Sequence, residues 1–104
     1  MILYNHTTAA LRQALPADGA WQESIQIIGT GATVRAIPGA GGAITVAYTL
    51  DSLAEINADT ADWYTAPLFN GVAVETEDSP LSRVTAIKAK QVGGSAPGTL
   101  KVCQ

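Results

Sequence analysis

Nucleophilic catalysis in this chain would have to involve its one histidine or its one cysteine, which are His6 and Cys103. A serine or cysteine nucleophile needs a neighbouring base to take up its proton. His6 stands near the N-terminus, where chains are usually poorly ordered unless tied down. Reactive thiols need a cationic setting, and only Lys101 is close to Cys103 in sequence. We therefore predict a solvated or strand-end histidine, an inert thiol, no catalytic residues and no enzymatic activity.

Most of the acidic residues fall in two groups, which could in principle bind a cation or act as a carboxylate pair. The groups are Asp51, Glu55, Asp59 and Asp62, and then Glu75, Glu77 and Asp78. Calcium needs about six to eight oxygen ligands, usually from closely spaced Asp or Asn residues with a glycine. The first group lacks that pattern and is predicted to be a solvated acidic edge. The second would serve glycoside hydrolysis only across a cleft, and is predicted to keep a loop soluble, so no metal site is expected.

Two glycine-rich segments, residues 29–31 and 38–42, are candidates for phosphate-binding loops. Neither matches the motif of a P-loop or of a dinucleotide-binding turn that opens a helix. Each stands between two predicted strands, where turn geometry is a sufficient reason for glycine. The sequence therefore predicts no cofactor.

The adjacent aromatic residues Trp63 and Tyr64 are the strongest candidates for a binding surface. Large amphipathic rings serve in a core, in a contact with a protein partner or in a sugar-binding platform. Core packing at the start of a strand is the favoured interpretation, and partner contact comes second. Glycan binding is the third, for which Asp62 and Asn70 would supply polar groups.

Composition limits the partners that the chain can have. Its 104 residues include six Lys and Arg against nine Asp and Glu, a net charge of −3. This balance argues against nucleic acid, whose phosphates need basic residues, and against an anionic membrane surface. We also expect no signal peptide and no membrane-spanning segment. Only 14% of the residues are charged. Such a surface is poorly guarded against self-association, so we expect a homo-oligomer, most simply a dimer or trimer.

Alternation of apolar and polar residues predicts β-strands along most of the chain. In residues 44–50, Ile44, Val46, Tyr48 and Leu50 would face one side, with smaller or polar residues on the other. In residues 21–28 the same pattern places Trp21 on the core side. Short glycine loops separate the predicted strands 21–28, 33–37 and 44–50, and we predict that these three form a meander of two hairpins.

The remaining segments complete a predicted all-β fold. Further expectations are a strand or a helical turn at 8–15, a helical turn at 51–61 capped by Asp51 or Ser52, a tight turn at 70–71 and a polar loop at 75–80. Strands are expected at 81–91 and 99–103, the last with Leu100 and Val102 facing inward and Cys103 on the opposite face. About seven or eight short strands, with at most one or two helical turns, predict an antiparallel β-sandwich or jelly roll. Residues 1–104 would form one domain, in which 1–6 could be an N-terminal arm carrying Ile2, Leu3 and Tyr4.

Several of these strands carry motifs of a known group of proteins. They are GATV at Gly31–Val34, Trp63 near mid-chain, VTAIK at Val84–Lys88 and GTLKV at Gly98–Val102. In these motifs the chain resembles small virion proteins of tailed bacteriophages, often capsid cement or decoration proteins. The resemblance implies a β-sandwich, a structural role, and no catalytic residues to transfer. It also implies synthesis in the bacterial cytoplasm and a final place on the capsid exterior.

Two functional hypotheses follow from the resemblance. The first is a cement protein that binds the major capsid protein, or another virion protein, at many equivalent sites and stabilises contacts between capsomers. Ile2, Leu3 and Tyr4 could then add a strand to a neighbouring chain. The alternative is a tail, neck or head-fibre module that binds host glycans or another virion protein, with Trp63 and Tyr64 as the contact residues.

Overall fold

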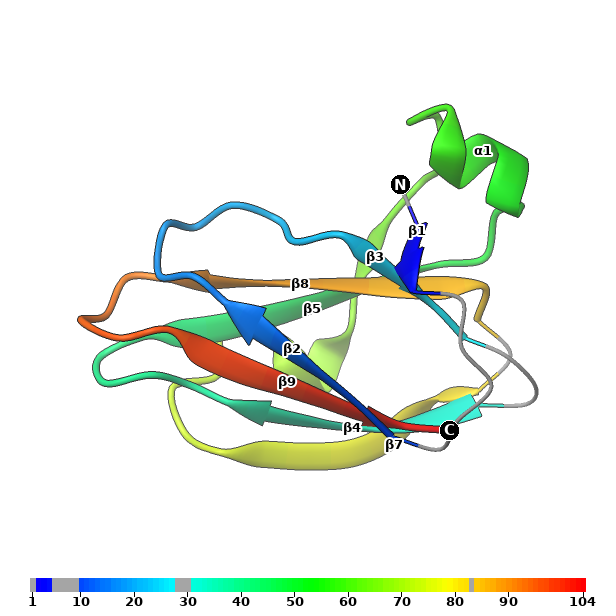
Figure 1. Cartoon of the computed structure of the whole chain (residues 1–104). Helices are drawn as coiled ribbons and strands as arrows, with labels where there is room; N and C mark the ends of the chain where they lie inside the picture. The colour runs from blue at the N-terminus through cyan, green and yellow to red at the C-terminus, as the bar shows by residue number, and fades with distance from the viewer. Residues whose placement is uncertain (1, 5–9, 28–30, 83) are drawn as a thin grey trace.

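Strands are the main secondary structure of the described chain, as the alternating sequence pattern predicts (Figure 1). The computed structural model describes residues 2–4, 10–27, 31–82 and 84–104. The strands are β1 (Ile2–Tyr4), β2 (Ala10–Leu15), β3 (Ser24–Gln26), β4 (Gly31–Ile37), β5 (Ala43–Thr49), β6 (Tyr64–Thr65), β7 (Thr76–Ser82), β8 (Ala86–Val92) and β9 (Gly98–Cys103). Helix α1 (Leu53–Asn57) and a 3-10 turn, η1 (Pro67–Phe69), join them.

The strands form two sheets that face each other across one core. Sheet A has the order β1-β3-β8-β5-β6, and sheet B has the order β2-β9-β4-β7. Pairing is antiparallel except between β1 and β3, which run parallel. The prediction of an all-β sandwich with one or two short helical turns is confirmed.

The predicted meander of two hairpins is wrong. Strands β3 and β5 belong to sheet A, where β8 lies between them, and β4 belongs to sheet B. The loop at residues 38–42 therefore carries the chain from one sheet to the other. The same happens at most later connections, so neighbours in a sheet are distant in sequence. A short glycine-rich loop fits a hairpin and a crossing between sheets equally well, which is why the sequence pattern alone misplaced these strands.

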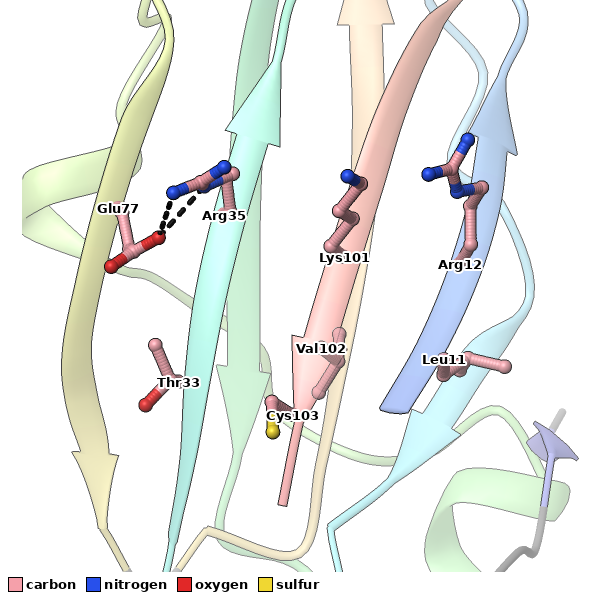
Figure 2. Close-up of a pocket in the computed structure, with 8 residues that line it drawn as sticks. All are labelled: Leu11, Arg12, Thr33, Arg35, Glu77, Lys101, Val102 and Cys103. Atoms are coloured by element: carbon pink, nitrogen blue, oxygen red, sulfur yellow. Dashed lines mark hydrogen bonds and ion pairs between the residues drawn. The ribbon is translucent and has the colours of Figure 1, made fainter. Parts of the chain in front are cut away.

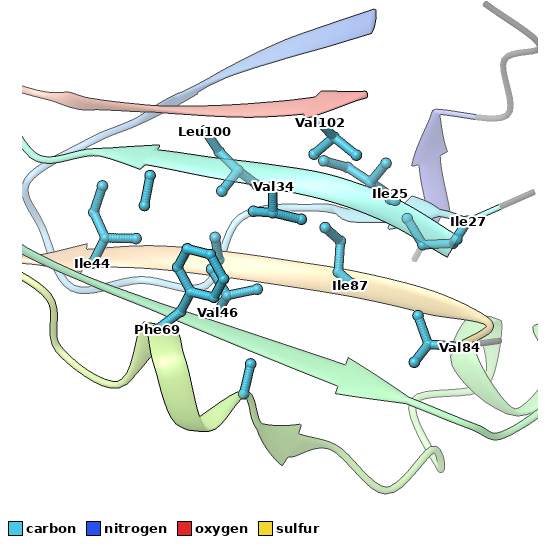
Figure 3. Close-up of a cluster of buried hydrophobic side chains, with 14 of the residues drawn as sticks. Ile25, Ile27, Val34, Ile44, Val46, Phe69, Val84, Ile87, Leu100 and Val102 are labelled. Carbon is cyan, nitrogen blue, oxygen red and sulfur yellow. The ribbon is translucent and has the colours of Figure 1, made fainter. Parts of the chain in front are cut away.

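The core lies between the inner faces of the two sheets (Figure 3). Its largest members are fully or almost fully buried: Leu15, Val34, Leu100 and Val102 from sheet B, and Ile25, Ile44, Val46 and Ile87 from sheet A, with Phe69 from η1. Burying an aliphatic or aromatic side chain of this size contributes about 1.5–3 kcal/mol. The predicted inward faces of the last strand and of Ile44 and Val46 in β5 are confirmed. Tyr48 is only half-buried, and Ala47 and Thr49 on the opposite face of β5 are buried as well. Leu50 is 63% exposed, because it follows the end of β5 instead of continuing it.

Helix α1 confirms the predicted helical turn and settles its N-cap as Ser52. The Ser52 hydroxyl accepts a hydrogen bond from the Glu55 backbone N–H at 3.2 Å, and the Glu55 carboxylate accepts one from the Ser52 backbone N–H. This reciprocal pair satisfies two backbone donors at the start of the helix. Asp51 has a different role, because its carboxylate accepts a hydrogen bond from the Asp62 backbone N–H at 2.7 Å and so closes the loop.

Three local segments differ from, or decide between, the predicted conformations. Residues 10–15 form a strand, which decides between the two alternatives for that part of 8–15. The polar loop expected at 75–80 is wrong, because Thr76–Ser82 form the edge strand β7, where charged residues and a proline are well tolerated. The turn at 70–71 is present, with Gly71 at a φ of 69°, but it links η1 to a single bridge between Val72 and Ile44, not two hairpin strands.

Candidate functional site

The structure separates the residues that the sequence singled out. His6 lies outside the described residues. The backbone of Ile2–Tyr4 pairs with β3 of the same chain, so in this structure the segment adds a strand to its own sheet A. Whether it can also bind a neighbour stays a prediction. Cys103 is exposed on the outer face of sheet B, opposite in direction to the buried Val102, as predicted.

The aromatic pair divides between two environments. Tyr64 is 53% exposed and its ring lies against that of Tyr48, with centroids 5.9 Å apart. Trp63 is half-buried and lies outside the main core, on the outer side of sheet A. Core packing was the favoured interpretation of both residues, and neither belongs to the main core cluster. Trp21, predicted on the core side of its strand, is 39% exposed on the same outer surface as Trp63. β3 begins only at Ser24, so the alternation that placed Trp21 inside does not extend to it.

Two tryptophans enclose one lysine on the outer face of sheet A. The Lys88 ammonium lies 4.7 Å from the ring centroid of Trp21 and 4.4 Å from that of Trp63. Lys90, two residues along β8, places its ammonium 4.6 Å from the Trp21 ring. We call Trp21, Trp63, Lys88 and Lys90 the Trp–Lys cluster. Each such cation–π contact is worth about 0.5–2 kcal/mol, depending on how far water is excluded.

The Trp–Lys cluster changes the electrostatics of Lys88. Burial between the rings lowers the pKa of Lys88 below its ordinary value, because the neutral amine loses less hydration than the ammonium. The Asp59 carboxylate opposes this shift, and the neighbouring charge of Lys90 adds to it. A hollow of about 270 Å³ opens beside the cluster, with Glu23 and Asp59 in its lining. Aromatic faces and carboxylates therefore meet at one concave place.

A second surface lies on the outer face of sheet B (Figure 2). Cross-strand register places Arg12 on β2 opposite Lys101 on β9, Lys101 opposite Arg35 on β4, and Arg35 opposite Glu77 on β7. We call Arg12, Lys101 and Arg35 the basic row. Neighbouring strands are about 4.8 Å apart, so the row spans roughly 10 Å. It borders a hollow of about 470 Å³ whose lining also contains Cys103.

The two ends of the basic row differ in their partners. Arg35 donates a hydrogen bond to the Glu77 carboxylate from Nε at 2.7 Å and forms ion pairs with Glu77 at 2.6 Å and Glu75 at 3.5 Å. In the part of the chain that the structure describes, no hydrogen bond or ion pair engages the side chains of Arg12 or Lys101. The acidic group predicted to lie in a soluble loop is thus the counter-charge at one end of the row.

Sequence reasoning missed both surfaces, and only one of them had a readable signal. Lys88 and Lys90 alternate with the buried residues Ile87, Ala89 and Gln91, which places both lysines on one outer face. The basic row had no such signal, because it depends on the pairing of strands that are far apart in the sequence. All three of its members are single basic residues in otherwise uncharged strands, and the register of these strands cannot be read from spacing.

Neither surface has the groups expected of a metal centre. Within residues 2–4, 10–27, 31–82 and 84–104, no three His, Cys, Asp or Glu residues come together so that they could hold a metal ion. In these ranges no helix is long and apolar enough to cross a membrane. Comparison with known proteins finds no family model, no curated protein and no solved structure that matches this chain.

Proposed function

We propose that this chain is a structural protein of a bacteriophage virion, which binds the outer capsid shell and stabilises the contacts between capsomers. The sequence motifs that resemble small virion proteins suggest the class. The observation that carries the proposal is the outer face of sheet B, which is four strands wide and presents accessible side chains (Figures 1 and 2). A protein that cross-links subunits needs a broad contact surface of this kind and does not need catalytic residues.

Multivalency explains how a small chain could act in this way. Each copy would bury only part of one sheet face, so a single contact could be weak. Many copies on a symmetric shell would raise the free energy needed to separate two capsomers. A dimer or trimer that bridges two capsomers would do the same, and neither case requires a new kind of contact. The proposed partner is the major capsid protein or another virion protein on the capsid exterior.

Copy number in purified particles tests this proposal. We expect mass spectrometry of particles of the virus that encodes the chain to find it at a ratio near one to the major capsid protein, or at a simple fraction of one. A handful of copies per particle would instead place the chain in the neck, tail or fibre. Its absence from the particles would contradict a virion role.

The Trp–Lys cluster favours glycan binding as a second candidate function. Sugar rings stack on exposed aromatic faces, and their hydroxyl groups donate to carboxylates. Trp21 and Trp63 supply the rings, and Glu23 and Asp59 supply carboxylates in the same hollow. In this reading the chain is a tail or fibre module that attaches to host polysaccharide.

Tryptophan fluorescence tests the glycan function, because both of the chain's tryptophans lie in the cluster. We expect a panel of bacterial surface saccharides to include at least one that shifts the emission in a saturable way. Replacing Trp63 with alanine should remove the response. Replacing Tyr48 with phenylalanine should leave it unchanged, because Tyr48 belongs neither to the Trp–Lys cluster nor to the lining of its hollow. Emission that stays constant across the panel would count against this function.

A further inference from the structure

The basic row is electrostatically unfavourable for the isolated chain. Like charges directly opposite each other on neighbouring strands destabilise a sheet. Arg12 faces Lys101, and Lys101 faces Arg35, so the row contains two such pairs in succession. Glu75 and Glu77 relieve only Arg35, at the far end of the row. The row gathers half of the chain's six basic residues on one face of an acidic protein.

We propose that the basic row is the docking site for an acidic segment of a protein partner, whose carboxylates compensate Arg12 and Lys101. This inference rests on the proposed function and deepens it, because it names the surface and the chemistry of the contact with the shell. The hollow of about 470 Å³ beside the row gives the segment a concave seat. Carboxylates accept charge-assisted hydrogen bonds from arginine and lysine, which are stronger than neutral ones.

The charges around the row favour a short acidic segment over a nucleic acid. Glu75 and Glu77 close the row at β7, so an extended polyanion that crosses the face would meet them after three strands. The net charge of −3 repels a long polyanion more than a short acidic segment, because the long polyanion places many more charges near the acidic protein. Two carboxylates, by contrast, can reach the two uncompensated cations without approaching β7. The two uncompensated cations of the row therefore match a segment that carries one or two acidic side chains.

The test uses the only cysteine of the chain as a reporter, since Cys103 is exposed in the lining of the hollow. The rate at which iodoacetamide alkylates Cys103 is measured in low salt with a peptide of five glutamates, with a matched peptide of five glutamines, and with a short oligothymidylate. We expect the glutamate peptide alone to slow alkylation, and high salt to cancel the protection.

Lys101→Glu is the decisive variant, with Lys90→Glu on the outer face of sheet A as the matched control. Lys101→Glu should weaken binding of the glutamate peptide roughly tenfold or more, whereas Lys90→Glu should leave it within about twofold. The same Lys101→Glu change places a carboxylate between Arg12 and Arg35, so it should raise the Tm of the free chain by roughly 2–6 °C. Weaker binding in a more stable protein cannot come from misfolding.

Several results would overturn the inference. They are the absence of protection by the glutamate peptide, equal protection in Lys101→Glu, stronger protection by oligothymidylate, and a lower Tm for Lys101→Glu. The amount of the chain bound to virus particles distinguishes a failure of this inference from a failure of the proposed function. Full occupancy of the shell by Lys101→Glu would refute the basic row as the docking site and leave the cement role intact. If the unaltered chain is absent from particles but still binds the glutamate peptide in a way that depends on Lys101, the cement role is refuted. The basic row then remains a docking site for an acidic segment.

Discussion

Replacing Gln91 with leucine should lower the free energy of unfolding by about 3 kcal/mol and the Tm by roughly 12–20 °C. Gln91 is fully buried, and its amide connects two loops. Its oxygen accepts a hydrogen bond from the Gly39 N–H at 2.9 Å, and its nitrogen donates to the carbonyls of Ala96 at 2.8 Å and Gly93 at 3.2 Å. Leucine would leave all three backbone groups without that partner.

The backbone around Gln91 is shaped to its side chain, which adds to the expected loss. A Cβ on Gly42 would overlap the Gln91 amide, and a Cβ on Gly98 would overlap its oxygen. The two glycines thus allow the backbone to approach the amide on both sides. A branched leucine side chain fits this narrow space poorly, and overpacking in a close-packed interior is destabilising in its own right.

Gln13→Leu is the matched control, because Gln13 is the other buried glutamine in the described part of the chain. Its nitrogen donates one hydrogen bond to the Glu23 carbonyl at 3.1 Å, but its oxygen has no partner. Losing one hydrogen bond while removing an unsatisfied buried oxygen should change the free energy of unfolding by less than about 1 kcal/mol. Thermal or denaturant unfolding measures the stability of both variants. Equal losses would contradict the conclusion that the Gln91 amide holds the two loops together.

The contrast between these glutamines shows what the sequence could and could not predict. Alternation placed Ile44, Val46, Leu100 and Val102 in the core, because a strand has only two faces and apolar residues occupy one of them. The same alternation puts Gln91 on the inner face, yet it gives no reason for a buried amide. That reason lies in the loops at 38–42 and 93–97, whose proximity depends on how the strands cross between sheets.

Crossing between sheets is also why the candidate surfaces could be predicted only in part. Trp63 was recognised as an unusual residue, but its partners, Trp21 and Lys88, come from different segments. The basic row needs Arg12, Lys101 and Arg35 in one register. The cross-strand neighbour of a single basic residue cannot be identified until the order of the strands in the sheet is known. Local sequence therefore predicted the inner and outer faces only within the strands and failed beyond their ends, at Trp21 and Leu50, whereas tertiary pairing decided which outer residues meet.

Replacing Phe69 with alanine should have the largest effect of any single change in the core, a loss of about 3–5 kcal/mol. Phe69 is the chain's only phenylalanine, and among the described residues it has the largest fully buried side chain. It projects from η1 into the space between the sheets, and η1 contacts both β5 and β7 (Figure 3). It therefore packs where the chain leaves sheet A for sheet B. Domains of this size are stable by only about 5–15 kcal/mol, so the variant should be close to unfolding at 37 °C.

Graded replacements distinguish a packing role from a general sensitivity of this turn. Phe69→Leu keeps most of the apolar volume, so its loss should be less than half that of Phe69→Ala. Leu68→Ala alters the preceding residue of η1, but that side chain is 53% exposed and should change stability by no more than about 0.5 kcal/mol. Chemical denaturation gives all three values. An equal loss of stability in Leu68→Ala and Phe69→Ala would contradict the packing role of the Phe69 ring. It would indicate that the conformation of the turn, and not the aromatic ring between the sheets, stabilises this edge of the sandwich.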